Sequence, residues 1–272
     1  MESLHNLSLT AYGSAFLARP ASGIPELFPT SSVFRFTHSI EFWRHARRFG
    51  VFRADECVGD RCAPWYADLR TRGALTIRLG RSAATPRNRV LAPHVEAGFS
   101  GGLDTVMAVR FADRHCALWS GRWAVTARKH PEQRIWSVKV HGVRTHASPY
   151  EGPDLFAATG RLDAALEAVL SLVAGRRYFE SWERTFRNAR ACLFSSAREI
   201  EYHPDLLPSE DYDLQARRLL AAASQAWVFG GMGSWNDVAL EDDGRYKPFT
   251  IELFEAVLDA VLAAANSRMK PA

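Results

Sequence analysis

The spacing of hydrophobic residues changes once along the chain. Between about residues 74 and 141, apolar positions alternate with polar ones, as in Leu75, Ile77 and Leu79 and again from Trp136 to Val140. A period of two is typical of strands that bury one face. We therefore predict an antiparallel sheet with one polar face in the first half of the chain.

Local signals predict two further elements in this half. Residues 115–119 and 122–128 flank Ser120-Gly121, a two-residue connection that suits a tight β-hairpin. Upstream, Phe42 and Phe49 lie on one side of a helical period, which predicts a short amphipathic helix before the sheet. The first half is thus expected to consist mostly of strands.

After Gly152 the period becomes 3.6, which is typical of helices that bury one stripe. We predict four of them: one capped by Thr159, one over residues 182–200, one capped by Ser209 and one that begins at Thr250. Strands followed by helices indicate the α+β class. The expected fold is an N-terminal antiparallel sheet packed with a C-terminal group of about four helices.

The change of pattern coincides with a change of charge. Residues 1–150 carry 21 Lys and Arg against 11 Asp and Glu, whereas residues 151–272 carry 13 against 19. Residues 1–150 thus form a basic, strand-rich half and residues 151–272 an acidic, helical half, as two domains or as one integrated domain. Their opposite charges could attract each other across an internal interface. Nucleic acid could instead bind the basic half, but this is not favoured, because nucleic-acid-binding proteins cluster their Lys and Arg more tightly.

The compartment follows from cysteines and hydropathy. The chain has four cysteines in 272 residues, too few and too scattered for a disulfide framework. Its first residues lack a basic segment followed by an unbroken apolar run, and the longest uncharged run, 219–235, falls short of the roughly 20 apolar residues that span a bilayer. We expect a soluble, cytoplasmic protein without a membrane segment.

One short motif suggests nucleotide chemistry. Residues Ser100 to Thr105 read Ser-Gly-Gly-Leu-Asp-Thr, and over these six residues the chain resembles the phosphate-binding loop of the PP-loop ATP pyrophosphatases. The resemblance implies an adenylating enzyme with ATP and Mg²⁺ as cofactors. Its phosphate-binding residues would be Ser100, Gly101, Gly102, Asp104 and Thr105.

The context of this motif favours a different interpretation. The family's loop follows an apolar parallel strand and begins a helix. Here Pro93, His94 and Glu96 interrupt the preceding segment, and residues 105–111 look as much like a strand as like a helix. We therefore interpret the glycines as a turn between strands and keep the nucleotide-dependent enzyme as the alternative.

A second segment, residues 226–237, indicates a binding surface. Gly230 and Gly231 can end the third predicted helix. The residues after them combine an aromatic side chain, an adaptable methionine and short polar groups, which is the composition of a recognition surface. Trp235 can be either a core residue or an exposed anchor, and the sequence leaves both alternatives open. The predicted partner-binding residues are Met232, Ser234, Trp235, Asn236 and Asp237.

With its flanking helices, at about residues 200–268, this segment is similar to C-terminal regions of uncharacterised bacterial proteins of the kind found as immunity or antitoxin partners. The resemblance implies a cytoplasmic, non-catalytic protein that binds a toxin and blocks its active site. The basic first half is unlike an inhibitor that mimics nucleic acid, so a nuclease is not the expected toxin unless the acidic half makes the contact. The preferred function is the binding of a protein partner.

Histidines provide the remaining candidates for catalysis or metal binding. His141 and His146 could converge with His115, His130 or Asp113 on a metal or proton-transfer site. Their spacing matches no metal-binding signature, and the chain has no Gly-x-Ser-x-Gly nucleophile motif. We therefore assign neither catalytic residues nor a metal site from the sequence.

Overall fold

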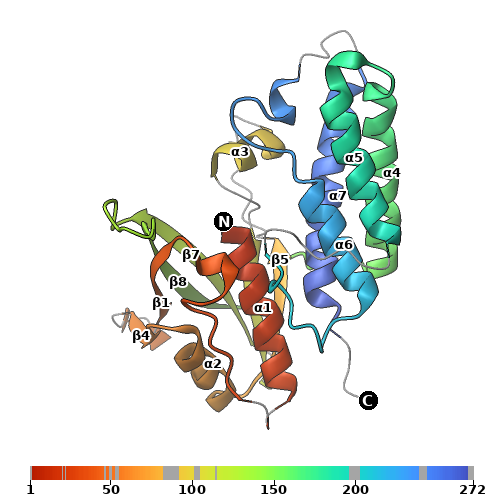
Figure 1. Ribbon diagram of the computed structural model, residues 1–272. Coiled ribbons are helices and arrows are strands. Elements are labelled where there is room, and N and C mark those ends of the chain that lie inside the picture. Colours follow the sequence, from red (N-terminus) through yellow and green to blue (C-terminus); the bar gives the residue numbers. More distant parts are fainter. Residues whose placement is uncertain are drawn as a thin grey trace.

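The protein is an α+β structure in which a mixed sheet adjoins a bundle of helices (Figure 1). None of the described helices combines the length and the apolar character that a membrane crossing requires. The computed structural model describes residues 2–19, 21, 23–45, 47–48, 51–52, 55–81, 92–100, 105–113, 115–195, 203–238 and 244–268.

The main sheet has six strands in the order β4-β1-β8-β7-β6-β5, and β2 (Arg47–Arg48) pairs only with β3 (Val51–Phe52). The sheet is not purely antiparallel as predicted, because β1 runs parallel to β8. Alternation of side chains cannot reveal strand direction, since parallel and antiparallel strands share the period of two. The strands are β1 (Thr37–Arg44), β4 (Glu56–Gly59), β5 (Ala74–Arg81), β6 (Thr105–Phe111), β7 (Cys116–Val125) and β8 (Trp136–Thr145).

Two local predictions for this half are wrong. Ser120-Gly121 is not a hairpin turn but lies inside β7, where Gly121 pairs with Val140 of β8. Phe42 belongs to strand β1 rather than to a helix, and its ring stacks on Trp65 with centroids 4.4 Å apart. In both places pairing with β8 satisfies the backbone hydrogen bonds, and this outweighs the local turn or helix signal.

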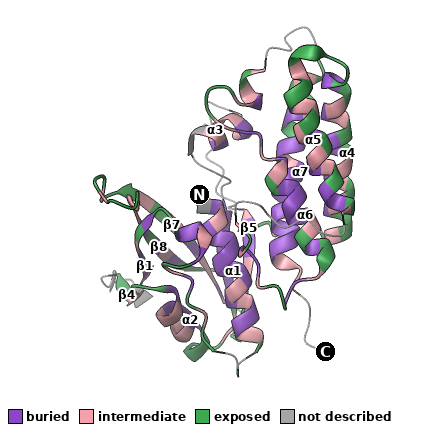
Figure 2. Ribbon diagram, viewed as in Figure 1, coloured by how far each residue is buried: buried purple, intermediate pink, exposed green. Residues whose placement is uncertain are grey.

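Two helices cover one face of the sheet. They are α1 (Glu2–Ala18) and α2 (Cys62–Thr71), and α1 lies between the sheet and the bundle (Figure 2). The sequence did not predict α1 because it is buried on nearly every side, including its polar Ser8 and Thr10, so it has no amphipathic stripe.

The four predicted C-terminal helices all exist, but their starts differ. Helices α4 (Leu155–Val173) and α6 (Leu214–Gln225) are capped by Asp154 and Asp213, not by Thr159 and Ser209. Each aspartate accepts a hydrogen bond from the backbone N–H three residues ahead, at 2.8 Å. Helices α5 (Glu180–Phe194) and α7 (Tyr246–Asn266) complete the bundle, and α3 (Pro93–Ser100) stands apart from it in the sequence.

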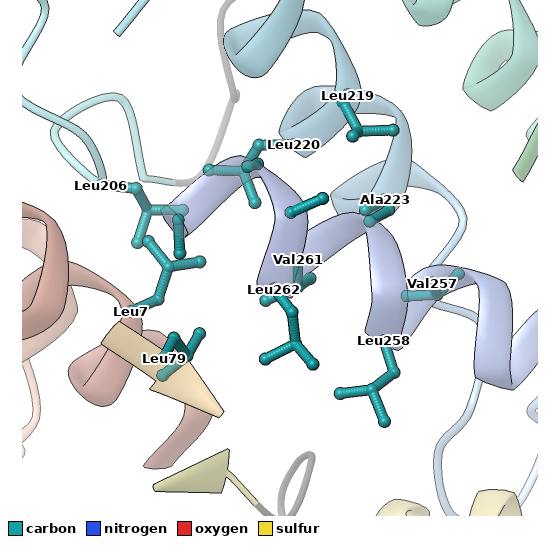
Figure 3. Close-up of a cluster of buried hydrophobic side chains, with 14 of the residues drawn as sticks. Leu7, Leu79, Leu206, Leu219, Leu220, Ala223, Val257, Leu258, Val261 and Leu262 are labelled. Carbon is teal, nitrogen blue, oxygen red and sulfur yellow. The ribbon is translucent and has the colours of Figure 1, made fainter. Parts of the chain in front are cut away.

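A single hydrophobic core joins the sheet to the bundle. Figure 3 shows Leu7 of α1 and Leu79 of β5 beside Leu206, Leu220 and Leu262, all of them buried. The core therefore contains residues from both the basic and the acidic half of the chain. It fixes the bundle relative to the sheet and so positions the loops at the end of the bundle.

Candidate functional site

The predicted binding segment forms a loop at one end of the bundle, between α6 and α7. Trp235 begins the short 3₁₀ helix η3 (Trp235–Asp237) and is completely buried. Its ring centroid lies 4.9 Å from that of Phe186 and 5.5 Å from that of Trp182, both on α5. Its indole Nε1 donates a hydrogen bond to Thr250 Oγ1 at 3.0 Å.

The sequence left open whether Trp235 is a core residue or an exposed anchor, and the structure places its side chain in the core. Its aromatic partners come from α5 and its hydrogen-bond acceptor from α7, segments that the loop's own sequence does not reveal. A buried indole whose N–H donates a hydrogen bond is stabilised by the hydrophobic effect without the cost of an unpaired donor. The ring thus anchors the loop to the core instead of contacting a partner.

The other end of the loop faces solvent. The side chain of Met232 is fully exposed. Gly233 adopts a φ of +83°, which favours glycine, and its N–H donates to Asp237 Oδ2 at 2.6 Å. Ser234 Oγ donates to the Gly230 carbonyl at 3.0 Å. These bonds hold the loop in one shape with Met232 at its tip.

The remaining residue of the predicted set, Asn236, joins the loop to α3. Its Nδ2 donates to the backbone carbonyls of His94 and Gly230, each at 3.3 Å. The backbones also touch, because a Cβ atom on Gly98 would lie only 2.4 Å from the Gly230 oxygen. The structure thus places α3, which ends at Ser100, directly against the loop.

This contact brings the two segments selected from the sequence close together, but it does not reproduce a PP-loop. Ser100 is the last residue of α3 and Thr105 is the first of β6, whereas Gly101, Gly102 and Asp104 lie outside the described residues. The flanking order is helix and then antiparallel strand, the reverse of the family's strand, loop and helix.

Thr105 is also engaged inside the protein. Its carbonyl and Oγ1 both accept hydrogen bonds from Asn6 Nδ2 of α1, at 3.0 and 3.2 Å, and its side chain is buried. In this geometry the Thr105 hydroxyl ties the start of β6 to α1 and is not directed at a ligand.

His94 shapes the electrostatics beneath the loop. Burial and the nearby Lys247 lower the pKa of its imidazole, so the ring is neutral at pH 7. Among the described residues, neither His94 Nδ1 nor Asn236 Oδ1 has a hydrogen-bond partner. Both atoms are buried, so the group that the site presents to solvent is the apolar side chain of Met232, which suits binding better than acid–base or nucleophilic chemistry.

A Ser-His-Asp cluster near α1 does not have the geometry of a hydrolase triad. Ser32 Oγ lies 2.9 Å from His203 Nδ1, and the Asp205 carboxylate accepts from the Ser32 hydroxyl and, at 2.9 Å, from its N–H. In a triad the acid orients the histidine instead of binding the serine. Asp205 thus tethers the start of the 3₁₀ helix η1 (Ser32–Phe34).

The histidines considered from the sequence separate into different clusters. His115 and His146 lie side by side with ring centroids 5.3 Å apart, and Asp113 Oδ2 is 2.9 Å from His115 Nδ1. His130 instead packs near His38, with centroids 5.6 Å apart. His141 belongs to a third cluster, with two residues that the sequence analysis did not select.

Comparison with known proteins adds no relative. No protein-family model matches the chain, and no curated protein or solved structure matches it either. The class defined by the fold is an α+β protein whose six-stranded mixed sheet shares one core with a helical bundle.

Proposed function

We propose that this protein acts by binding a protein partner through the loop of residues 230–237, in the manner of an immunity protein that neutralises a toxin. One observation carries the proposal: the loop is held rigidly by its own hydrogen bonds and by buried Trp235, yet it presents Met232 wholly to solvent.

A rigid loop is a favourable start for association. Binding costs conformational entropy when a loop must be ordered at an interface. Most of the backbone of this loop is ordered before any partner arrives, so that cost is reduced. Methionine then adapts its unbranched side chain to the partner's surface, which is why it is common at protein-binding sites.

Two further exposed apolar residues lie at the same end of the bundle as Met232. Tyr178 is 95% exposed and lies just before α5, and Ile251 is 38% exposed on the first turns of α7. Both lie at the same end of the bundle as the loop, because Trp235 contacts Trp182 of α5 and Thr250 of α7. We call Met232, Tyr178 and Ile251 the bundle-end surface.

The polar residues around Met232 suit the rim of an interface. Asp237 is exposed and Ser234 and Asn236 are half-buried, so an apolar centre is bordered by hydrogen-bonding groups. The surface also belongs to the acidic half of the chain, which favours a partner with basic groups near the contact. Cys57, Cys62 and Cys116 are free thiols, in keeping with action in the reducing cytoplasm.

The proposal can be tested by site-specific photo-crosslinking in cells that produce the chain. A photoreactive residue at position 232 is expected to capture one defined protein. The matched control is position 156, because Phe156 is 84% exposed but lies at the opposite end of α4 from the loop. Capture from both positions, or from neither, would contradict a contact surface at the loop.

The captured protein then allows a quantitative test. Met232→Asp places a charge at the centre of the surface and is expected to weaken the purified complex at least tenfold, about 1.4 kcal/mol. Phe156→Asp should leave the affinity unchanged. In a growth assay, the partner expressed alone should be toxic, and the wild-type chain but not Met232→Asp should restore growth. A harmless partner would refute the immunity role, and an unaffected complex would refute the surface.

A further inference from the structure

Three side chains on or directly beside separate strands meet at the sheet, away from the bundle-end surface. His45 directly follows β1, Asp55 directly precedes β4, and His141 lies within β8. One imidazole nitrogen from each histidine and one carboxylate oxygen lie within 4.8 Å of one another. Within the described part of the chain, no other group of three such ligands was found.

The pairing of the strands creates this convergence. Trp43 of β1 pairs with His141 of β8 on one side and with Cys57 of β4 on the other. Residues two apart on a strand share a face, so His45 and Asp55 lie on the same face as His141. This face is turned away from α2, because Phe42, next to Trp43 in the strand, points the other way to stack on α2.

The distances are close to those of a metal site. His45 Nδ1 contacts Asp55 Oδ1, and His141 Nδ1 lies 3.8 Å from Asp55 Oδ2. In tetrahedral zinc sites the ligand atoms lie about 2.0–2.1 Å from the ion, so they are about 3.4 Å from one another. The contact between His45 and Asp55 is shorter than this separation and would have to open, whereas the more distant ligand atoms, which lie within 4.8 Å of one another, would have to approach by about 1.4 Å at most. Rotation of the partly exposed side chains can supply both movements.

From this geometry we infer that His45, Asp55 and His141 bind a divalent transition-metal ion such as Zn²⁺. Two imidazoles and one carboxylate are suitable ligands for this class of ion, and three protein ligands leave a coordination position open. A backbone hydrogen bond from His45 N to Gly142 O, at 3.1 Å, holds the first ligand beside β8. The three side chains are partly exposed, so an ion can enter.

The neighbouring charges indicate what occupies the open position. Lys139 lies two residues before His141 on the same face of β8 and is paired with Glu41 of β1 at 3.5 Å. Arg122 of β7, which pairs with Lys139 across the strands, therefore supplies the excess positive charge next to the cluster. Both side chains are exposed. Cations beside a metal ion attract a small anion, so the fourth ligand is expected to be hydroxide or an oxyanion.

The same sheet contains a matched control. His115, His146 and Asp113 have the same residue types, and His115 makes a similar contact with its aspartate, but these residues do not form a three-ligand group. If the first cluster were only a surface ion pair, the two sets should behave alike. If it binds metal, only His45, Asp55 and His141 should affect the affinity.

The test is a calorimetric titration of the metal-stripped, untagged full-length protein with Zn²⁺, accompanied by a visible-absorption titration with Co²⁺. The wild type should bind one ion and give the absorption bands of Co²⁺ with a tetrahedral ligand set. His45→Ala and Asp55→Ala should each weaken binding at least tenfold. His115→Ala and His146→Ala should match the wild type, and circular dichroism should show that each variant is folded.

Specific outcomes would overturn the inference. Failure of the wild type to bind, or equal loss in the His115 and His146 variants, would show that the cluster is an ion pair alone. Cys57→Ser tests whether the exposed thiol is the actual ligand, and binding lost only in that variant would exclude the cluster. Met232→Asp should leave metal binding unchanged, so this result does not depend on the proposed partner surface.

Discussion

The loop of residues 230–237 and the His45–Asp55–His141 cluster are built in opposite ways. The loop is one continuous segment, whose shape depends on hydrogen bonds among its own residues and on one buried anchor, Trp235. The cluster has no continuous segment, because its residues come from three parts of the chain that strand pairing brings together.

This difference predicts how each site responds to damage. The loop should be sensitive to losses in the bundle core beneath it, and the cluster to losses that disturb the sheet. One hydrophobic core joins the sheet to the bundle. The contacts across this junction therefore determine how strongly a substitution in the bundle affects the sheet, and the reverse. Substitutions of Trp235 in the bundle, of His5 beneath the sheet and of Asn266 at the junction between them measure how much each place contributes to the free energy of unfolding.

The largest effect is expected for Trp235→Ala. Replacing a fully buried aromatic side chain with alanine should lower the free energy of unfolding by about 3–5 kcal/mol, because a large cavity forms between α5 and α7. Urea denaturation measures this loss. Trp235→Phe keeps a ring but loses the bond to Thr250, so a smaller loss is expected. A loss below about 1 kcal/mol for Trp235→Ala would show that the anchor is unimportant.

An intermediate effect is expected from His5, beneath the covered face of the sheet. His5 Nε2 donates to the Val33 carbonyl at 2.7 Å, and the ring lies 4.6 Å from that of Trp123. Burial lowers the pKa of His5 to about 3, from its ordinary value of 6.5. The unfolded chain therefore binds the proton more readily, and the stability present above pH 6.5 is lost as the pH falls from 6.5 towards 3.

This pH dependence can be measured. Between pH 7 and pH 4.5 the protein should lose about 2–3 kcal/mol of unfolding free energy through His5 alone. His5→Gln preserves a donor for Val33 but cannot titrate, so its stability should fall less over the same range. Other buried histidines contribute equally to both proteins, and the difference isolates His5. Parallel pH profiles would refute the assignment.

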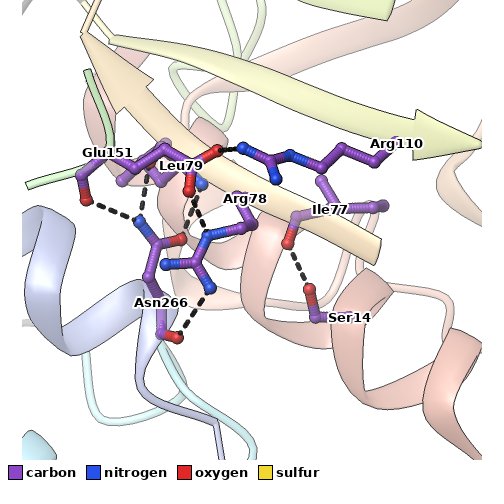
Figure 4. Close-up of polar contacts among 7 residues, drawn as sticks. All are labelled: Ser14, Ile77, Arg78, Leu79, Arg110, Glu151 and Asn266. Atoms are coloured by element: carbon purple, nitrogen blue, oxygen red, sulfur yellow. Dashed lines mark hydrogen bonds and ion pairs between the residues drawn. The ribbon is translucent and has the colours of Figure 1, made fainter. Parts of the chain in front are cut away.

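The smallest of the three effects is expected for Asn266→Ala, at the junction of the sheet and the helical bundle (Figure 4). Asn266 Oδ1 accepts from Leu79 N at 2.8 Å, and its Nδ2 donates to Leu79 O at 2.8 Å and to Glu151 O at 3.0 Å. Its amide thus satisfies the backbone of β5 from the end of α7. Unsatisfied backbone groups should cost about 1–3 kcal/mol.

Ser267→Ala provides the control for this junction, because Ser267, the residue directly after α7, donates a hydrogen bond from its Oγ to the Ala264 carbonyl of the same helix. Its unfolding free energy should change by less than about 0.5 kcal/mol. Thermal denaturation of both variants measures the difference. Equal losses would show that the contact between α7 and β5 adds nothing beyond local helix stability.

The sequence by itself determined the elements whose signals are local. Periodicity and neighbouring residues in the chain predicted the α+β class and the four C-terminal helices. They also marked residues 230–237 by their mixture of glycine, aromatic, methionine and short polar residues. Such patterns are visible without the fold because each amphipathic helix repeats its own buried stripe.

Only the tertiary structure decided the features that depend on distant partners. Helix α1 is buried on nearly every side, β1 joins β8 in parallel, and Trp235 is covered by α5 and α7. His45, Asp55 and His141 meet only because β4, β1 and β8 are adjacent. Strand order and burial are properties of the packed chain, since backbone hydrogen bonds and core contacts across long separations override local preferences.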